Sequence, residues 1–156
     1  SYGSAAGKMK TERYWESHSM AETEEIGRSL GECARPGQVY GLDGDLGTGK
    51  TVLARGFARG LGITQDIMSP TFTIVHEYRE GRIPLFHFDV YRLADEDALW
   101  EIGWEDYLDA SGVCLVEWAS QRAESMPAET QWIRIEKDLS KGTEYRRIVL
   151  TSGEQI

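Results

Sequence analysis

Eight consecutive residues have the types and the spacing that phosphate chemistry needs. The segment from Gly44 to Thr51 reads GDLGTGKT and matches the pattern G-x-x-x-x-G-K-[ST] without substitution. Its glycines let successive backbone N–H groups turn toward one anion, and a helix that begins there adds the partial positive charge of its N-terminus. Lys50 is expected to reach the outer phosphates of a nucleotide, and Thr51 to offer its hydroxyl to magnesium. The predicted phosphate-binding residues are Gly44, Asp45, Leu46, Gly47, Thr48, Gly49, Lys50 and Thr51.

The base of that nucleotide is expected to be adenine. Guanine specificity usually comes with an Asn/Thr-Lys-x-Asp element, and the chain contains neither an asparagine nor the sequence Thr-Lys-x-Asp. The predicted ligand is therefore ATP with Mg²⁺.

Two acids at the ends of predicted strands are candidates to complete the site, because a magnesium nucleotide also needs carboxylates. Glu117 follows the apolar run VCLV in the Walker B form, at the strand edge where ligands of such sheets bind. Asp89 ends the run FHF less cleanly. The alternative is that either acid only caps its strand or pairs with an arginine such as Arg92. His76 and His87 alternate with apolar residues, and ordinary packing is expected for both.

The elements that must position these residues follow from periodicity and punctuation. A strand over 38–42 leads into the glycine loop. The helix that opens at about Gly49 carries Val52, Leu53 and Phe57 at core-facing spacing. Strand, glycine loop and helix together are the context that a phosphate-binding loop requires.

The rest of the chain predicts alternating strands and helices. Ser19 is a predicted N-cap, and Glu22 completes a capping box. Within 94–109, Trp100 and Trp104 are expected to be buried rather than exposed docking aromatics. The predicted elements are a strand over 11–17, a helix from Ser19 to about Cys33, a hairpin over 72–78 and 83–91, one or two short helices within 94–109 interrupted near Gly103, a strand over 113–116, and two strands within 132–137 and 144–150.

Length and charge limit the functional classes. The 156 residues suit one domain; residues 1–8 are interpreted as a cloning remnant, which leaves a single P-loop ATPase domain over 9–156. A net charge of −9 has the wrong sign for binding phosphates by counterion release, so no strong direct nucleic-acid binding is expected. A small basic patch or ordinary solvated surface are both open for Arg55, Arg59, Arg146 and Arg147. No stretch is apolar enough to span a membrane, and a cytoplasmic location is expected.

Four motifs in a fixed order resemble one protein family. They are the glycine loop, SPTFT at 69–73, HFDVYRL at 87–93 and VEW at 116–118. The chain resembles the bacterial TsaE family, the small ATPase of tRNA threonylcarbamoyladenosine synthesis. The resemblance implies an α/β fold, a P-loop NTPase-like three-layer sandwich with a mixed, partly antiparallel sheet. It also implies ATP hydrolysis that is weak alone and stimulated by partners. Those partners are TsaD and TsaB, which together attach a threonylcarbamoyl group to adenosine 37 of tRNAs reading codons that begin with A.

The resemblance also implies roles for particular residues. Thr51 and Glu117 would hold magnesium, and Asp89 would be catalytic or support the metal. Thr71 would bind the nucleotide from a switch-like segment near the γ-phosphate, and the helix start around Ser19 and Met20 would lie near the nucleotide. The predicted catalytic residues are Lys50, Asp89 and Glu117.

Two other functional classes stay open. A small-molecule kinase of this size would use the same loop, but such enzymes usually carry an arginine-rich lid, and acids dominate 94–125. A nucleotide-gated binding module without turnover would bind ATP and partners even when Glu117 is replaced.

Overall fold

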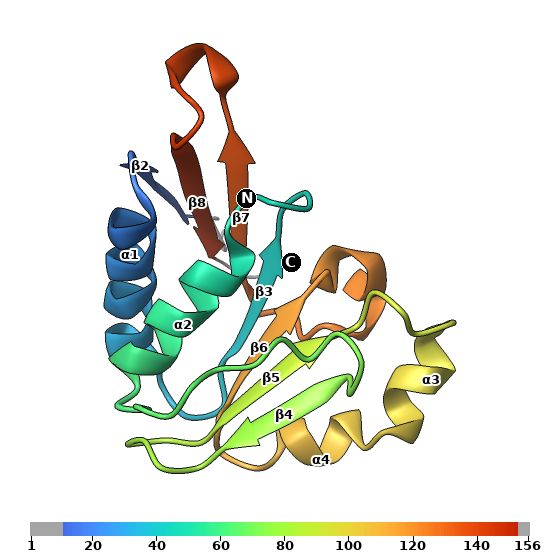
Figure 1. The fold of residues 1–156 in the computed structure, drawn as a ribbon. Coiled ribbons are helices and arrows are strands. Elements are labelled where there is room, and N and C mark those ends of the chain that lie inside the picture. The colour runs from blue at the N-terminus through green and yellow to red at the C-terminus, as the bar shows by residue number, and fades with distance from the viewer. Residues whose placement is uncertain (1–10, 153–156) are drawn as a thin grey trace, which may run out of the picture.

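The computed structural model describes residues 11–152, so the interpretation of residues 1–8 as a cloning remnant lies outside the described residues. At its centre is a seven-stranded sheet in the order β2-β8-β7-β3-β6-β5-β4 (Figure 1). The strands are β2 (Thr11–Ser17), β3 (Val39–Asp43), β4 (Val75–Tyr78), β5 (Leu85–Asp89), β6 (Val113–Glu117), β7 (Gln131–Lys137) and β8 (Arg146–Ser152). The helices are α1 (Met20–Cys33), α2 (Lys50–Gly60), α3 (Glu96–Glu101), α4 (Trp104–Leu108), and the 3₁₀ turns η1 (Ala119–Ser125) and η2 (Leu139–Lys141).

The sheet is mixed, as expected. Strand β3 lies parallel to both β6 and β7, and β5 lies parallel to β6. The pairs β2–β8, β7–β8 and β4–β5 are antiparallel. Because β3, β5 and β6 run in the same direction, their carboxyl ends meet at one edge of the sheet, where ligands of such sheets bind.

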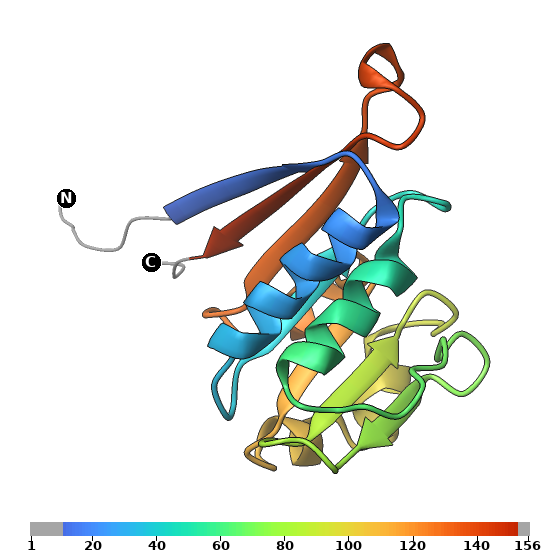
Figure 2. The ribbon, with the colours of Figure 1, turned by 60° about the vertical axis from the view of Figure 1, so that its left-hand side comes forward.

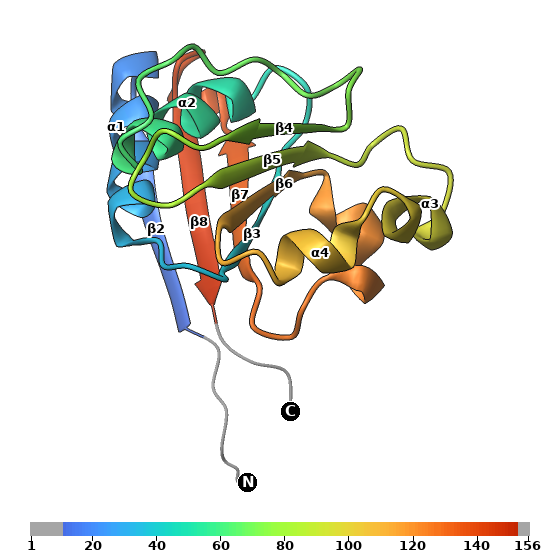
Figure 3. The same cartoon turned by 90° about the horizontal axis from the view of Figure 1, so that it is seen from below.

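Helices cover both faces of the sheet, which confirms the three-layer α/β sandwich. Helices α1 and α2 lie side by side on one face, whereas α3 and α4 lie on the other (Figures 2 and 3). Each interface has its own apolar core: Leu53, Phe57 and Leu42 belong to the first, and Phe88 and Trp104 to the second. Within residues 11–152, no helix has the length and apolar character to cross a membrane.

Glycines let α1 and α2 pack with their backbones almost in contact. A Cβ atom at Gly27 would lie 2.3 Å from the Leu53 carbonyl oxygen, and one at Gly31 would lie 2.1 Å from that of Phe57. Real Cβ atoms do not approach an oxygen so closely, so this crossing requires residues without side chains. The packing fixes α2, the helix that follows the glycine loop, against the rest of the fold.

Most local predictions are confirmed, with informative differences. Ser19 caps α1 by accepting the Glu22 N–H at 3.1 Å, but the Glu22 side chain accepts from the N–H of His18 rather than from that of Ser19. Trp104 is buried as expected and donates from Nε1 to the Ser125 carbonyl at 2.9 Å. The expectation for Trp100 is wrong, because 43% of it is exposed.

The predicted strand over 72–78 begins only at Val75. Residues 71–73 instead form a turn, in which the Ile74 N–H donates to the Pro70 carbonyl at 2.8 Å. Ile74 has a φ of 72°, which a β-branched residue rarely adopts. The SPTFT motif therefore lies in a turn before the strand rather than in the sheet.

Candidate nucleotide and magnesium site

The glycine loop runs from the end of β3 to the start of α2, as the sequence predicts. Gly47 and Gly49 have φ values of 78° and 102°, which only glycine adopts at little cost. Gly49 is the N-cap of α2 and supplies no side-chain cap. The first backbone N–H groups of α2 therefore have no side chain that competes with an anion.

Arg146 on β8 braces the outer side of the loop. Its Nε donates to the Thr48 carbonyl at 2.7 Å, and its Nη2 donates to the Gly47 carbonyl at 3.3 Å. Because these carbonyls bond outward to a guanidinium, the peptide planes of the loop are held against rotation. Arg146 is a functional candidate that the sequence does not distinguish from a basic patch or from solvated surface.

The Lys50 side chain lies folded over the loop. Its ammonium group donates to the Gly44 carbonyl, and to that of Asp45 at 3.3 Å. The same group lies 4.2 Å from the centroid of the Trp118 ring. Burial lowers the pKa of the Lys50 ammonium, while the negative charges of Glu117 and Asp89 oppose that shift.

The two predicted carboxylates face each other across neighbouring strands. Asp89 ends β5 and Glu117 ends β6, and the two residues are direct partners in the parallel register. Each is only 5% exposed. Burial raises the pKa of the Asp89 carboxyl, and the charge of Glu117 adds to the rise, whereas a hydrogen bond from the Tyr91 N–H opposes it. The alternative pairing of Asp89 with Arg92 is not what the structure has; Arg92 lies over the Phe72 ring instead.

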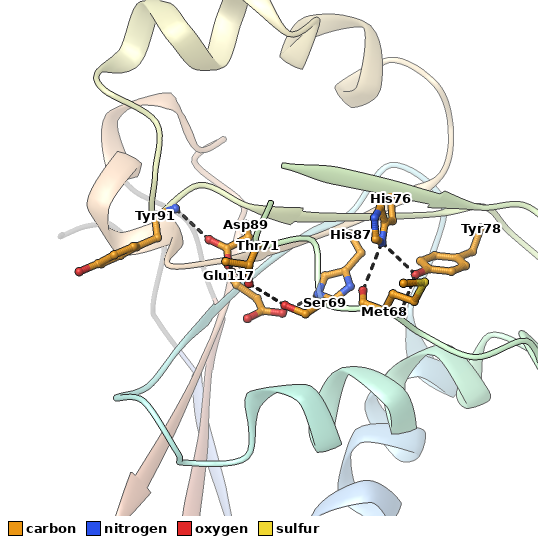
Figure 4. A network of polar contacts seen from close by, with 9 residues as sticks. All are labelled: Met68, Ser69, Thr71, His76, Tyr78, His87, Asp89, Tyr91 and Glu117. Atoms are coloured by element: carbon orange, nitrogen blue, oxygen red, sulfur yellow. Dashed lines mark hydrogen bonds and ion pairs between the residues drawn. The ribbon is translucent and has the colours of Figure 1, made fainter. Parts of the chain in front are cut away.

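The turn of the SPTFT motif reaches Asp89 through Thr71. The Thr71 hydroxyl donates to Asp89 Oδ2 at 3.3 Å, while the Tyr91 N–H donates to Oδ1 at 2.9 Å. Ser69 and Thr71 share a hydrogen bond of 2.7 Å between their hydroxyls (Figure 4). A movement of this turn would therefore change the surroundings of Asp89 directly.

The expectation of ordinary packing for His87 is wrong. Its ring is buried, and Nε2 lies 2.6 Å from Glu117 Oε2 (Figure 4). His76 does lie apart from the carboxylates: its Nδ1 is 3.2 Å from the Met68 carbonyl and 3.3 Å from the Tyr78 hydroxyl. Alternation along a strand locates a side chain on a face, but it does not say what the neighbouring strand places beside it.

A cavity of about 450 Å³ joins most of the predicted residues. Its lining includes, from the predicted set, Leu46, Gly47, Gly49, Lys50, Thr51, Thr71, Asp89 and Glu117, and also Met20 at the start of α1. Gly44, Asp45 and Thr48 instead line a separate cavity of about 590 Å³ on another side of the loop. Trp118 lines both cavities and packs against Tyr91, with the ring centroids 4.8 Å apart and the ring planes tilted by 46°. It belongs to the VEW motif but is not among the predicted site residues.

The chemistry of these donors fits magnesium. Within the part of the chain that the structure describes, no three His, Cys, Asp or Glu side chains cluster as a complete metal cage. Magnesium does not require one, because it is usually held by one or two carboxylates together with substrate phosphates and water. The Thr51 hydroxyl, Glu117 and Asp89 line one cavity with the P-loop and are oxygen donors of the required kind.

Comparisons with known proteins agree on one family. The family model described as "Threonylcarbamoyl adenosine biosynthesis protein TsaE" matches residues 17–148. The tRNA threonylcarbamoyladenosine biosynthesis protein TsaE of Bacillus subtilis is 44% identical over 138 residues, which cover 88% of this chain and 84% of that protein. The protein of the same name from Nostoc sp. is 41% identical over 136 residues, which cover 85% of this chain and 74% of that protein.

A solved structure shares the fold. The crystal structure of Bacillus subtilis YdiB superposes with a TM-score of 0.79 at 40% sequence identity. The match covers 92% of this chain and 87% of that chain. Sequence and structure comparisons therefore cover the glycine loop, both carboxylates and the elements that hold them.

Proposed function

This chain belongs to the TsaE family of tRNA threonylcarbamoyladenosine biosynthesis proteins, and from that premise we propose that it binds ATP with Mg²⁺ at the P-loop and hydrolyses the γ-phosphate bond. The hydrolysis serves threonylcarbamoyl modification of adenosine 37 in tRNAs that read codons beginning with A. The protein acts on a complex of TsaD and TsaB and is a weak ATPase without them.

The observation that carries the proposal is the pairing of Asp89 with Glu117 in one cavity with the P-loop. The backbone N–H groups at the start of α2 bind the phosphates, and Lys50 exchanges the carbonyls of Gly44 and Asp45 for phosphate oxygens. When bound, magnesium would neutralise negative charge that develops on the phosphates. Thr51 and Glu117 would hold it.

Asp89 has the properties of a group that orients the attacking water. It is buried beside the metal carboxylate, and its two oxygens are fixed by the Tyr91 N–H and the Thr71 hydroxyl. Because burial and Glu117 raise the pKa of the Asp89 carboxyl, it is a better proton acceptor than an ordinary aspartate. Its link to Thr71 makes its position depend on the conformation of the SPTFT turn.

The need for a partner is supported by the surface around the cavity. Leu46 in the loop is 82% exposed and Phe72 in the turn is 84% exposed. Met20, Met68 and Tyr91, which line the cavity or adjoin residues that do, are also exposed. Apolar side chains gathered around a functional site favour a protein partner over open solvent. Together with the net charge of −9, they support contact with TsaD and TsaB while those partners contact the tRNA.

The first test is phosphate release from ATP by the protein alone and with purified TsaD and TsaB. Strong stimulation that is lost in Glu117→Ala would support the proposal and its metal site together. An absence of stimulation by a protein that still binds ATP would contradict it. Phosphate transfer to a small acceptor faster than to water would then favour the kinase alternative. If the wild-type protein shows no turnover, and ATP binding and partner docking survive in Glu117→Ala, the binding module would be favoured.

A further inference from the structure

A hydrogen bond between two neighbouring strands of the sheet joins a histidine to the predicted metal carboxylate. His87 lies on β5 and Glu117 on β6, and the two strands are parallel neighbours. His87 pairs in register with Leu115, so its ring reaches forward along the sheet to the carboxylate two residues later. The side chains of His87 and Glu117 are 1% and 7% exposed, and Nε2 lies 2.6 Å from Oε2.

We propose that His87 is a positioning residue for Glu117: it holds the carboxylate in the orientation that receives Mg²⁺. The inference rests on the proposed function, because it assigns the metal to Glu117. His87 itself is not among the lining residues of the cavity, so it acts through Glu117 rather than on the nucleotide.

The hydrogen-bonding pattern determines the direction of the bond. Among residues 11–152, buried His87 Nδ1 has no hydrogen-bond partner. A proton on Nδ1 would therefore be a buried donor left unpaired, which is rarer than an unpaired acceptor. The neutral ring with its proton on Nε2 avoids that cost and donates to Glu117 Oε2. One carboxylate oxygen is then fixed by the ring, and the other is left for the cavity that Glu117 lines.

Glu117 needs such support more than Asp89 does. A glutamate has one more rotatable bond than an aspartate, and Asp89 is already held by the Tyr91 N–H and the Thr71 hydroxyl. The charges of Asp89 and Glu117 also repel each other. A donor behind Glu117 opposes that repulsion without adding a group to the cavity. Hydrogen bonds to metal-binding side chains of this kind commonly contribute about 10- to 100-fold in metal affinity or activity.

The test is the Mg²⁺ dependence of nucleotide binding, which does not depend on turnover. The probe is a fluorescent ATP analogue, titrated against the full-length protein in EDTA and over a series of MgCl₂ concentrations. His87→Leu removes the donor and puts an apolar side chain in its place. His87→Gln keeps an N–H donor of similar reach, and His76→Leu on neighbouring β4 is the matched control, because His76 contacts neither carboxylate.

In His87→Leu the half-saturating Mg²⁺ concentration should rise about 10-fold or more, while affinity in EDTA stays within about twofold of wild type. His87→Gln should recover most of the loss, and His76→Leu should match wild type. An unchanged Mg²⁺ dependence in His87→Leu would overturn the inference, as would an equal loss of affinity in EDTA, which would indicate a purely structural role. A Glu117→Gln arm separates this failure from that of the proposed function. If Glu117→Gln also binds Mg²⁺ and nucleotide normally, the metal assignment itself is wrong.

A second measurement covers the case in which His87→Leu does not fold. Long-range ¹⁵N–¹H spectra of the wild-type protein distinguish the two neutral tautomers of each of its three histidines, and His87→Gln identifies the His87 signals. The proton should be on Nε2. A proton on Nδ1 would mean that His87 accepts rather than donates, and would overturn the proposal.

Discussion

Gly56 of α2 lies against the backbone of Glu24 in α1, so that a Cβ atom at position 56 would be 2.0 Å from the Glu24 carbonyl oxygen. A Cβ atom at Gly60 would likewise lie 2.2 Å from the Arg28 carbonyl oxygen. Gly27 and Gly31 of α1 and Gly56 and Gly60 of α2 thus bring the two backbones together where the helices cross. Helix α2, which follows the glycine loop, is held in place at these points by backbone packed against backbone, so no flexible side chain is there to absorb an added methyl group.

Gly56→Ala should therefore destabilise the protein although alanine favours helices. Overpacking of this kind typically costs about 1–3 kcal/mol and occasionally more, which outweighs the helix-propensity gain of about 1 kcal/mol. Denaturant unfolding followed by circular dichroism measures the change. Ser29→Ala, at an exposed position of α1, is the matched control and should stay within about 0.5 kcal/mol of wild type. Equal stability of Gly56→Ala and wild type would show that the helices can separate without cost.

Arg146→Ala should weaken nucleotide binding although no nucleotide contact is assigned to this side chain. The substitution releases the Gly47 and Thr48 carbonyls, so the loop must become ordered when phosphate binds. Hydrogen bonds to charged groups contribute about 1.5–3 kcal/mol, so a roughly tenfold or larger rise in the Kd for ADP is expected by calorimetry. Arg147→Ala is the control, because Arg147 contacts Glu136 and the Tyr14 ring instead. Equal affinities of Arg146→Ala and Arg147→Ala would contradict the bracing role.

The sequence could predict the glycine loop and the two carboxylates, but not the partners of Arg146 and His87. The glycine loop and its strand–loop–helix context depend on local patterns, and the structure has them where the pattern predicts. The pairing of Asp89 with Glu117 was accessible too, because both end strands whose carboxyl ends share one edge. Arg146 and His87 act on segments 98 and 30 residues away along the chain. Their partners depend on strand order and register, which periodicity in one sequence does not specify.

The glycines of α1 and α2 were unpredictable for the same reason. Inside a helix, glycine lowers the local propensity, and only the position of the second helix explains its presence. The late start of β4 has a local cause, since the turn of the SPTFT motif uses the Ile74 N–H before the ladder begins.

If the proposed function is correct, removing any one of the charged or hydroxyl groups of the proposed phosphate and metal site should abolish partner-stimulated hydrolysis. For Lys50→Ala, Thr51→Ala and Glu117→Ala we expect losses of about 100-fold or more in phosphate release, because each group stabilises charge on the phosphates or holds the metal. Lys50→Ala should also weaken nucleotide binding. Lys141→Ala is the control, since this exposed lysine pairs with Glu16 and does not line the cavity. Normal hydrolysis by Glu117→Ala would show that the metal site is assigned wrongly.

Asp89→Asn should stabilise the folded protein while it removes the proposed proton acceptor. Burial and the charge of Glu117 raise the pKa of the Asp89 carboxyl above its ordinary value of 3.8, so the folded state retains this proton at a pH where the unfolded chain has lost it. The free energy of unfolding therefore falls as pH rises from about 3.8 through the raised pKa, and the whole penalty applies at neutral pH. An asparagine carries no such penalty and keeps an oxygen that accepts from the Tyr91 N–H.

In the nucleotide-free and metal-free protein, Asp89→Asn should be more stable than wild type at pH 7, and the difference should shrink as pH falls toward 3.8. Denaturant unfolding at a series of pH values measures it. Asp138→Asn provides the opposite case: hydrogen bonds from Ser140 lower the pKa of Asp138, so its charge favours folding above the unfolded pKa and loses that effect as pH falls. That variant should gain nothing at pH 7. If Asp89→Asn were no more stable than wild type at neutral pH, the buried carboxylate would not be held at a cost, and a main reason for assigning it a catalytic role would be lost.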